Sequence, residues 1–409
     1  MRRVAVTGMG GITALGHDWP TISAALRDGR TAIRAMSPDW DRFEGVNTRL
    51  AAPVLDFDLP DHWPRKKTRT MGRVARMAVA ASETALADSG LLNDPVLTGG
   101  RAGAAFGSSF GSPDSVLGFY ELKMSGKSRN LNATTYIQMM SHTALVNIGL
   151  FFGLTGRMIP TSNACASASQ AIGFAAEAIR WGKADVMVAG GAEELDITDA
   201  AVFDTLFATS TRNDTPHLSP RPFDVDRDGL VIGEGAGALI LEDYDRARAR
   251  GATIHAEVAG FGTNADGNHV TQPQPGTMEQ ALRLALEDAG IDAGAIGVVN
   301  GHGTATEGGD IAEAAATAAV FGPRVPVHSL KSYFGHSLGA CGAIEAWLGI
   351  EMMREGWCCH TANLDKVDPR CAELDYIQGM PRRIDAEYLM SNNFAFGGVN
   401  ASLILRRGS

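Results

Sequence analysis

The chain has 409 residues, of which 45% are hydrophobic and 20% are charged, and it carries a formal net charge of −10 at pH 7. A chain of this length and composition can bury a large core, which excludes an intrinsically disordered protein. The negative charge would repel phosphate groups, so we expect no nucleic acid among its partners.

The N-terminal segment predicts a strand at residues 4–8, VAVTG, with a glycine-rich turn, VTGMGG, at its end. This turn lacks the GxGxxG spacing of a dinucleotide site, and its glycines interrupt the apolar run that a signal peptide requires. The most apolar stretch elsewhere, residues 144–154, is too short to span a bilayer. No membrane association is therefore predicted.

The five cysteines bear on the compartment of the protein. They are Cys165, Cys341, Cys358, Cys359 and Cys371. An odd number of cysteines without a CxxC pair argues against a disulfide framework in a long chain. We therefore expect a reducing, cytoplasmic location.

A basic segment at residues 64–76, PRKKTRTMGRVAR, leads into a predicted helix at residues 74–90. It contains no acid and carries these basic residues: Arg65, Lys66, Lys67, Arg69, Arg73 and Arg76. Two interpretations are open, because such a segment forms either a solvated helix face or a docking surface for an acidic partner.

Cys165 stands at the start of a predicted helix over residues 165–181, within TSNACASASQAIG. Apolar residues recur downstream at helical spacing, and Gly182 supplies a stop. A thiol at a helix start faces unpaired N–H groups and the positive end of the helix dipole, both of which lower the thiol pKa. Cys165 is therefore a candidate nucleophile; the alternative is a buried cysteine that only fills space.

Predicted strands and helices alternate along the rest of the chain. The strands lie at residues 185–191, 237–242, 296–300 and 325–329, and the later helices lie at 277–289 and 338–354. This alternation is typical of an α/β fold. The order of turns, loops and small-residue helices is similar before and after residue 250, so we predict two halves, residues 1–250 and 251–409, packed as one body.

Two short motifs suggest other chemistry. GHSLG at residues 335–339 fits the GxSxG elbow of serine hydrolases, with Ser337 as nucleophile, but SLKSYF separates it from the preceding strand and only His360 follows it. A serine hydrolase is kept as the alternative function. DVDRDG at residues 224–229 copies half of a calcium loop but has Gly235 at its twelfth position, so no metal site is predicted.

Two glycine-rich loops each carry a histidine. NGHGTATEGGD, residues 300–310, places His302 directly after a predicted strand, and SLKSYFGHSLGACGAIE, residues 329–345, places Lys331 and His336 before a helix of small residues. A lone histidine is usually structural. Two histidines in strand-end loops, in a chain with a cysteine at a helix start, indicate a catalytic site.

Five segments together carry a family resemblance. They are CASASQAIGFAAEAI around Cys165, RPFDVDRDGLVIGEGAGALILE (221–242), GHGTATEGGD, KSYFGHSLGACGAIE and SNNFAFGGVNASLIL (391–405). In this order they resemble the β-ketoacyl-acyl carrier protein synthases, the elongating condensing enzymes of fatty acid and polyketide synthesis. The resemblance covers essentially the whole chain. It implies the thiolase-like fold, in which two similar βαβαβαββ halves form a five-layered αβαβα body, and a homodimer.

The resemblance also implies a catalytic site and a decarboxylative Claisen condensation. Its members in this chain are Cys165, His302, His336, Lys331 and Glu345, the last as the carboxylate partner of the lysine. Cys165 would take an acyl group from a thioester, and the two histidines would donate N–H bonds to the enolate oxygen of a decarboxylating malonyl thioester. The later oxyanion would rest on the backbone N–H groups of Cys165 and Phe396. No metal or organic cofactor is implied.

Several further residues match substrate-contacting positions of this family. Thr304 and Thr306 match residues that bind the phosphopantetheine arm, and Phe394 and Phe396 match a gate over the cysteine. Ala395 stands where the family motif has glycine, which would reduce the backbone freedom of the gate. Two acids after the first histidine loop, Asp310 and Glu313, also match, although Asp-x-x-Glu is equally the pattern of a helix capping box.

The resemblance also bears on the carrier protein and the acyl chain. Lys66 and Arg69 match basic positions that meet the acidic carrier protein. Phe110, in GSSFGS, matches a position at the far end of the acyl pocket, where a phenyl ring would exclude long saturated chains. The alternative is that Phe110 turns aside into ordinary core.

A second class of function is open within the same family. Some members are silent subunits that only shape the pocket of an active partner in a heterodimer. Such subunits lack the nucleophile, whereas this chain retains Cys165 and both histidines. Fatty acid synthesis and specialised polyketide or polyene synthesis both stay open as the pathway.

Overall fold

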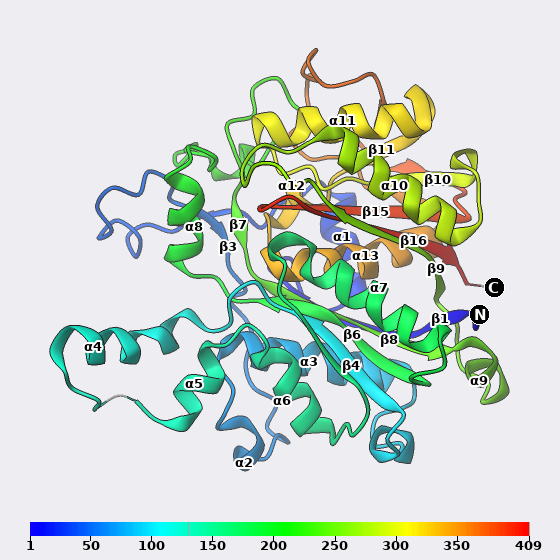
Figure 1. Cartoon of the computed structure of the whole chain (residues 1–409). Coiled ribbons are helices and arrows are strands. Elements are labelled where there is room, and N and C mark those ends of the chain that lie inside the picture. Colours follow the sequence, from blue (N-terminus) through cyan, green and yellow to red (C-terminus); the bar gives the residue numbers. More distant parts are fainter. Residues whose placement is uncertain (130, 409) are drawn as a thin grey trace.

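The chain passes twice through the same order of strands and helices (Figure 1). In the computed structural model, which describes residues 1–129 and 131–408, the first pass is β1 (Val4–Thr13), α3 (Arg73–Asp88), β4 (Ala102–Gly107), α6 (Thr143–Phe152), β5 (Met158–Thr161), α7 (Ser167–Arg180), β6 (Val186–Glu193) and β8 (Gly235–Asp243). The second is β9 (Ala256–Ala265), α10 (Pro275–Ala289), β10 (Ile296–Asn300), α11 (Glu307–Phe321), β11 (Pro326–His328), α13 (Cys341–Glu355), β15 (Tyr388–Ala395) and β16 (Val399–Arg407). Each half therefore has the βαβαβαββ order that the resemblance implied.

The strands of the two halves also have the same neighbours and directions. The order across the sheet is β5-β4-β6-β8-β1 in the first half and β11-β10-β15-β16-β9 in the second. In both halves the first two pairs are parallel and the last two are antiparallel. β1 and β9 join the halves through only two residue pairs, Ala5 with Glu257 and Val6 with Ala256.

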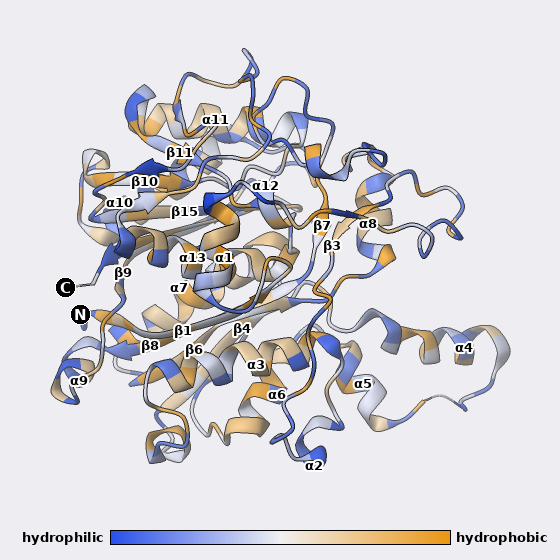
Figure 2. Cartoon of the chain, turned by 180° about the vertical axis from the view of Figure 1, so that it is seen from behind, coloured by the Kyte–Doolittle hydropathy of each residue, from blue (hydrophilic) through white to orange (hydrophobic). Residues whose placement is uncertain are grey.

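The elements stack in five layers (Figure 1). α3 and α6 cover one outer face, α10 and α11 cover the other, and α7 and α13 lie between the two halves of the sheet. Because α7 and α13 have sheet on both sides, almost every residue of α13 is buried. Figure 2 shows hydrophilic residues mostly on the outlying loops and on α9 (Tyr244–Ala249). The α/β class and the thiolase-like layering predicted from the sequence are thus observed.

The predicted helices correspond to observed ones, but the glycine-rich segment after the first strand does not form the predicted turn. The helices at 74–90, 165–181, 277–289 and 338–354 are α3, α7, α10 and α13, each within three residues at either end. VTGMGG instead belongs to β1, which continues to Thr13. A Cβ atom on Gly8 would lie 2.1 Å from the Ala85 carbonyl oxygen. Glycine is needed there because α3 packs directly on the strand.

Smaller elements complete the structure. The helices are α1 (Trp19–Arg27), α2 (Arg65–Thr68), α4 (Leu117–Ser125), α5 (Ala133–Met139), α8 (Ile197–Asp204) and α12 (Lys331–Phe334). The strands are β2 (Arg34–Ala35), β3 (Leu50–Ala52), β7 (Ile232–Gly233), β12 (Trp357–Cys358), β13 (Asp375–Tyr376) and β14 (Arg382–Arg383). α4 and α5 form an arm that projects from the layered body (Figure 1). Within the described ranges, no helix is long and apolar enough to cross a membrane.

Candidate active site

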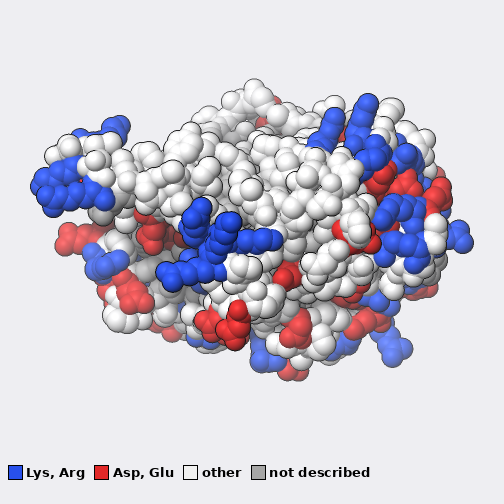
Figure 3. Space-filling view, turned by 90° about the horizontal axis from the view of Figure 1, so that it is seen from below, with Lys and Arg blue, Asp and Glu red and all other residues white. Residues whose placement is uncertain are grey.

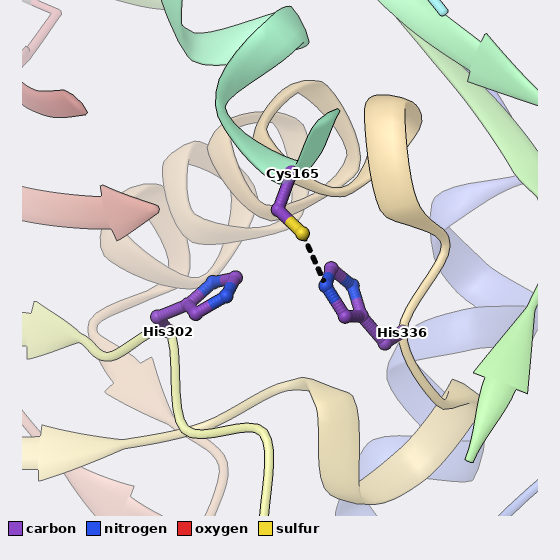
Figure 4. A group of neighbouring side chains, drawn as sticks. All are labelled: Cys165, His302 and His336. Carbon is purple, nitrogen blue, oxygen red and sulfur yellow. Dashed lines mark hydrogen bonds between the residues drawn. The ribbon is translucent and has the colours of Figure 1, made fainter. Parts of the chain in front are cut away.

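Three loops at strand ends bring together Cys165, His302 and His336 (Figure 4). Cys165 lies in the 3-10 turn Ala164–Ala166 between β5 and α7, His302 follows β10, and His336 lies between β11 and α13. All three side chains are buried. The two histidines follow the neighbouring parallel strands β10 and β11, whose carboxyl ends lie at the same edge of the sheet. Cys165 follows β5 of the other half, and the packing of α7 against α13 brings it to the histidines.

The cysteine and the two histidines are close enough to act on one substrate. The Nε2 atom of His336 lies 2.9 Å from the Sγ atom of Cys165. The rings of His302 and His336 are nearly perpendicular, with centroids 5.1 Å apart. One nitrogen of each ring and the Sγ atom all lie within 4.8 Å of one another. The sequence prediction that these three residues share a site agrees with this geometry.

The electrostatic setting of Cys165 differs from the sequence prediction. Burial raises the pKa of its thiol to about 11, although the backbone N–H groups of Phe396 and Cys165 and the Lys331 ammonium favour the thiolate. The expected lowering of this pKa by the helix start was therefore wrong. The reason is desolvation: Cys165 is only 3% exposed, so the loss of water around its thiol outweighs the peptide dipoles.

Both histidines are neutral at physiological pH. Burial lowers the pKa of His302 well below 6.5, and the nearby charge of Lys331 acts in the same direction. The pKa of His336 is lowered well below 6.5 by the same two causes. A neutral imidazole has one N–H donor and one acceptor, so each ring can donate a single hydrogen bond.

Lys331 and Glu345 form a buried ion pair behind the histidines. The Nζ atom of Lys331 donates to Oε1 of Glu345, and the side chains are 1% and 0% exposed. Burial lowers the pKa of Lys331, but Glu345, together with Cys341 and Glu313, more than offsets this, so the pKa is raised overall. The lysine is therefore a fixed positive charge, as its predicted pairing with Glu345 requires.

The acids after the first histidine loop hold the backbone of that loop. Glu313 accepts hydrogen bonds from the backbone N–H of His302 at 2.6 Å and of Gly303 at 2.7 Å. Asp310 accepts from the backbone N–H groups of Phe223 and Ala305. Burial raises the pKa of Glu313 to about 7 and that of Asp310 to about 6. The capping-box alternative is wrong because α11 already begins at Glu307, before both acids.

A cavity of about 480 Å³ opens over the three side chains. Its lining includes Cys165, both histidines, Thr304, Thr306, Phe394, Ala395 and Phe396. The hydroxyl oxygens of Thr304 and Thr306 lie 2.9 Å apart, and the Phe396 ring meets the Phe203 ring edge-on. The predicted arm-binding and gate residues therefore line the same cavity as Cys165.

Ala395 is not among the residues with positive φ, so the conformation seen here does not itself require glycine at this position. It is the last residue of β15 and pairs with Val399 across the turn to β16. The residues with positive φ in this turn are Gly397 at 93° and Gly398 at 78°. The conformational freedom that glycine provides is thus needed after Phe396, where the chain retains it.

Phe110, Lys66 and Arg69 lie outside this cavity. Phe110 is 45% exposed and is not among the residues that line the cavity, so its place at the end of an acyl pocket stays a prediction. Lys66 on α2 and Arg69 after it are exposed. Figure 3 views the side of the molecule on which α2 lies and shows patches of Lys and Arg there. Arg73 of the same basic segment is bound to Glu234 instead, at 2.8 Å.

The alternative hydrolase site is not assembled. Ser337 is fully buried, and its hydroxyl has no hydrogen-bond partner among the residues that the structure describes. His360 instead contacts the Tyr333 hydroxyl through Nδ1 at 3.2 Å. The histidine next to Ser337 is His336, which faces Cys165. The GHSLG segment therefore positions His336 beside Cys165.

Sequence reasoning missed Asn393, which lies among these residues. Its Nδ2 atom is 2.8 Å from Oε2 of Glu345 and 3.4 Å from Nδ1 of His302. An asparagine within a strand matches no catalytic motif, so its role could not be predicted from the sequence. The alternation of side chains along β15 predicts only that Asn392 and Asn393 point to opposite faces of the sheet.

Comparisons with known proteins show the family of the chain. Residues 1–247 match the family model of the beta-ketoacyl synthase N-terminal domain, and residues 255–365 match that of the C-terminal domain. The chain is 36% identical to a 3-oxoacyl-[acyl-carrier-protein] synthase 2 of Vibrio harveyi, over 99% of each chain.

Two solved structures extend the comparison. A beta-ketoacyl synthase from Burkholderia phymatum STM815 has a TM-score of 0.98 and 61% identity, with 100% of each chain covered. A type II PKS ketosynthase, solved in complex with its acyl-carrier protein, has a TM-score of 0.88 and 28% identity, with 99% of each chain covered. The two family models together span most of the chain, and on these grounds the chain belongs to the beta-ketoacyl synthase family.

Proposed function

We propose that this chain is a 3-oxoacyl-[acyl-carrier-protein] synthase that condenses an acyl group with a malonyl group. The observation that carries the proposal is the contact of 2.9 Å between His336 Nε2 and Cys165 Sγ, with His302 beside it under a cavity. The relative from Vibrio harveyi, which has the same activity in its name, supports it. A silent subunit would lack the nucleophile, so the presence of Cys165 disfavours that alternative.

The first half-reaction transfers the acyl group to Cys165. The sulfur attacks the thioester carbonyl carbon, the bond to the carrier thiol breaks, and the proton of Cys165 passes to that leaving thiol. Because burial raises the pKa of Cys165 to about 11, the thiol is protonated before substrate arrives. The Nε2–H group of His336 faces this sulfur at 2.9 Å and would donate to it as negative charge develops during the attack, so the same N–H is available to the enolate oxygen in the second half-reaction.

The second half-reaction forms the new carbon–carbon bond. Loss of carbon dioxide from the malonyl thioester leaves its electron pair as an enolate, whose oxygen would accept N–H bonds from His302 and His336. The enolate carbon then attacks the acyl carbonyl, and Cys165 leaves as thiolate. The backbone N–H groups of Phe396 and Cys165 already favour negative charge on Sγ, which supports their predicted role toward the oxyanion.

The substrates would arrive on a carrier protein. Thr304 and Thr306 line the cavity and would bind the phosphopantetheine arm, while Lys66 and Arg69 would meet the acidic carrier. The neighbouring ketosynthase that was solved with its acyl-carrier protein supports this kind of partner. We further propose a homodimer, a cytoplasmic location and a reaction that needs no metal or organic cofactor.

The test is to locate the acyl group after incubation with an acyl-carrier protein loaded with a short chain. We expect mass spectrometry of peptides to find it on Cys165, followed by release as a 3-oxoacyl product when malonyl carrier is added. An adduct on Ser337 would revive the hydrolase alternative. A folded enzyme that takes up no acyl group would contradict the proposal.

A further inference from the structure

Asn393 occupies the centre of a buried polar network behind the histidines. It lies on β15 and is fully buried. Its Nδ2 atom faces Glu345 Oε2 at 2.8 Å and His302 Nδ1 at 3.4 Å, while its Oδ1 atom accepts a hydrogen bond from Ser169 Oγ. One amide thus connects α7, α13 and the loop of His302.

The ion pair determines which way the amide points. The Lys331 ammonium donates to one oxygen of Glu345, which keeps that carboxylate an acceptor. If the amide of Asn393 were rotated, its oxygen would lie against the other carboxylate oxygen, and two acceptors at 2.8 Å repel each other. Nδ2 must therefore face Glu345, and its second hydrogen remains for another acceptor.

That second hydrogen has two acceptors within reach. Cys341 Sγ lies 3.3 Å from Nδ2, but its own S–H points to the backbone oxygen of Cys165, also at 3.3 Å, and a thiol sulfur is a weak acceptor. The Nδ1 atom of His302 is the stronger acceptor. If Nδ1 carried the proton instead, two donors would face each other across 3.4 Å.

We propose that Asn393 is a positioning residue that holds His302 in the tautomer with its proton on Nε2. Glu313 holds only the backbone of the His302 loop, and within residues 1–129 and 131–408 the Asn393 amide is the one hydrogen-bond partner of the His302 ring. This inference rests on the proposed function, in which His302 donates an N–H bond to the enolate oxygen. The other tautomer would present a lone pair to that oxygen and repel it.

Two substitutions and one matched control separate this role from simple packing. Asn393→Leu removes both donors at similar volume, and Asn393→Asp keeps the shape but replaces the donor with an acceptor. Ser169→Ala removes the hydrogen bond at the other end of the same amide and leaves both N–H groups in place. Circular dichroism identifies which variants fold. If Asn393→Leu does not fold, Asn393→Asp alone tests the role of the amide donor.

The direct measurement is nitrogen NMR of enzyme labelled at histidine, with His302→Gln to identify the signal. We expect the protonated nitrogen of His302 to be Nε2 in the wild type and in Ser169→Ala, and to change to Nδ1 at least in part in both Asn393 variants. Retention of the Nε2 proton in a folded Asn393 variant would overturn the proposal.

The kinetic measurement compares the two half-reactions. We expect kcat for malonyl decarboxylation to fall about 10–100-fold in the Asn393 variants, the usual cost of losing a residue that orients a catalytic group, with KM changed by less than about threefold. Acylation of Cys165 should stay near the wild-type rate. Equal losses in both half-reactions would indicate general damage and contradict a positioning role. A wild-type enzyme inactive in both would instead disprove the proposed function.

Discussion

In the segments that follow β5 and β11, which are equivalent strands of the two halves, the chain places Cys165 in one case and His336 in the other. At the ends of β4 and β10, which are also equivalent, it places Ser108 and His302 within two residues of the strand. The first of these loops continues into the projecting α4–α5 arm, and the second turns straight into α11. The two halves therefore have equivalent loop positions, but different side chains occupy them, and these side chains have different roles in the proposed reaction.

Two buried carboxylates, one from each half, are satisfied differently. Glu193, in the first half, accepts hydrogen bonds from the Ser108 hydroxyl at 3.0 Å and from the backbone N–H of Ser109 at 2.8 Å. Glu345, in the second half, pairs with the Lys331 ammonium. Neutral donors therefore satisfy Glu193, which holds loops in place. Glu345 instead fixes the Lys331 ammonium near the place where an enolate would form, and a nearby cation stabilises developing negative charge.

The largest effect should come from removing the nucleophile of the first half. In Cys165→Ala we expect condensation to fall by at least about 10⁴-fold, since no acyl-enzyme can form. Malonyl decarboxylation should persist, because both histidines belong to the second half and remain. Radiolabelled carbon dioxide release measures it, and its complete loss in a folded variant would refute this division of labour.

Breaking the ion pair of the second half should cost stability. In Lys331→Met the Glu345 carboxylate is left buried without a cation, and we expect the free energy of unfolding to fall by about 3–5 kcal/mol. Denaturant titration measures the change. The double variant Lys331→Met/Glu345→Leu should recover most of the loss, whereas an equally unstable double variant would show that packing, not charge, is responsible.

The pH dependence should differ between the residues of the two halves. Burial raises the pKa of Cys165 to about 11, so its thiolate is the minor form below that pH. The rate of iodoacetamide labelling of Cys165 should therefore rise about tenfold per pH unit from pH 7 to pH 10. Peptide mapping measures the rate, and a plateau near neutral pH would indicate a stable thiolate.

The rate of malonyl decarboxylation should instead depend on pH in the acid range. Burial lowers the pKa values of His302 and His336 well below 6.5, so the neutral rings persist as the pH falls through 6.5. We expect kcat to decline only at lower pH, where the rings become protonated. A decline centred at 6.5 would show that the histidines are exposed to water in the working enzyme.

The smallest effect should come from the surface of the first half. The pair Lys66→Glu and Arg69→Glu should raise KM for carrier-bound substrates about tenfold and leave kcat unchanged, because long-range charge acts on encounter and affinity. Lys183→Glu and Arg324→Glu make the same charge change at other exposed positions and serve as the control. Docking at α2 would be contradicted if the control pair raised KM as much as the α2 pair did. It would also be contradicted if the α2 pair raised KM equally for small thioester substrates.

The sequence by itself determined the α/β class, the approximate bounds of α3, α7, α10 and α13, and the segments that contain Cys165, His302 and His336. It could do so because periodicity and strand-end loops are local properties of the chain. The glycines of β1 were predicted to form a turn, because sequence alone does not distinguish a glycine that lets a helix pack closely on a strand from a glycine that bends the chain.

Only the tertiary structure decided the electrostatics of the site. The dipole at the start of α7 is local and predicts a lower pKa for Cys165, but the burial that raises this pKa comes from β15, α13 and the histidine loops packed around it. The position of Asn393 was hidden for the same reason, since its partners Ser169, His302 and Glu345 come from three different segments. Desolvation and hydrogen-bond partnership depend on all surrounding segments at once, and therefore appear only when the chain is folded.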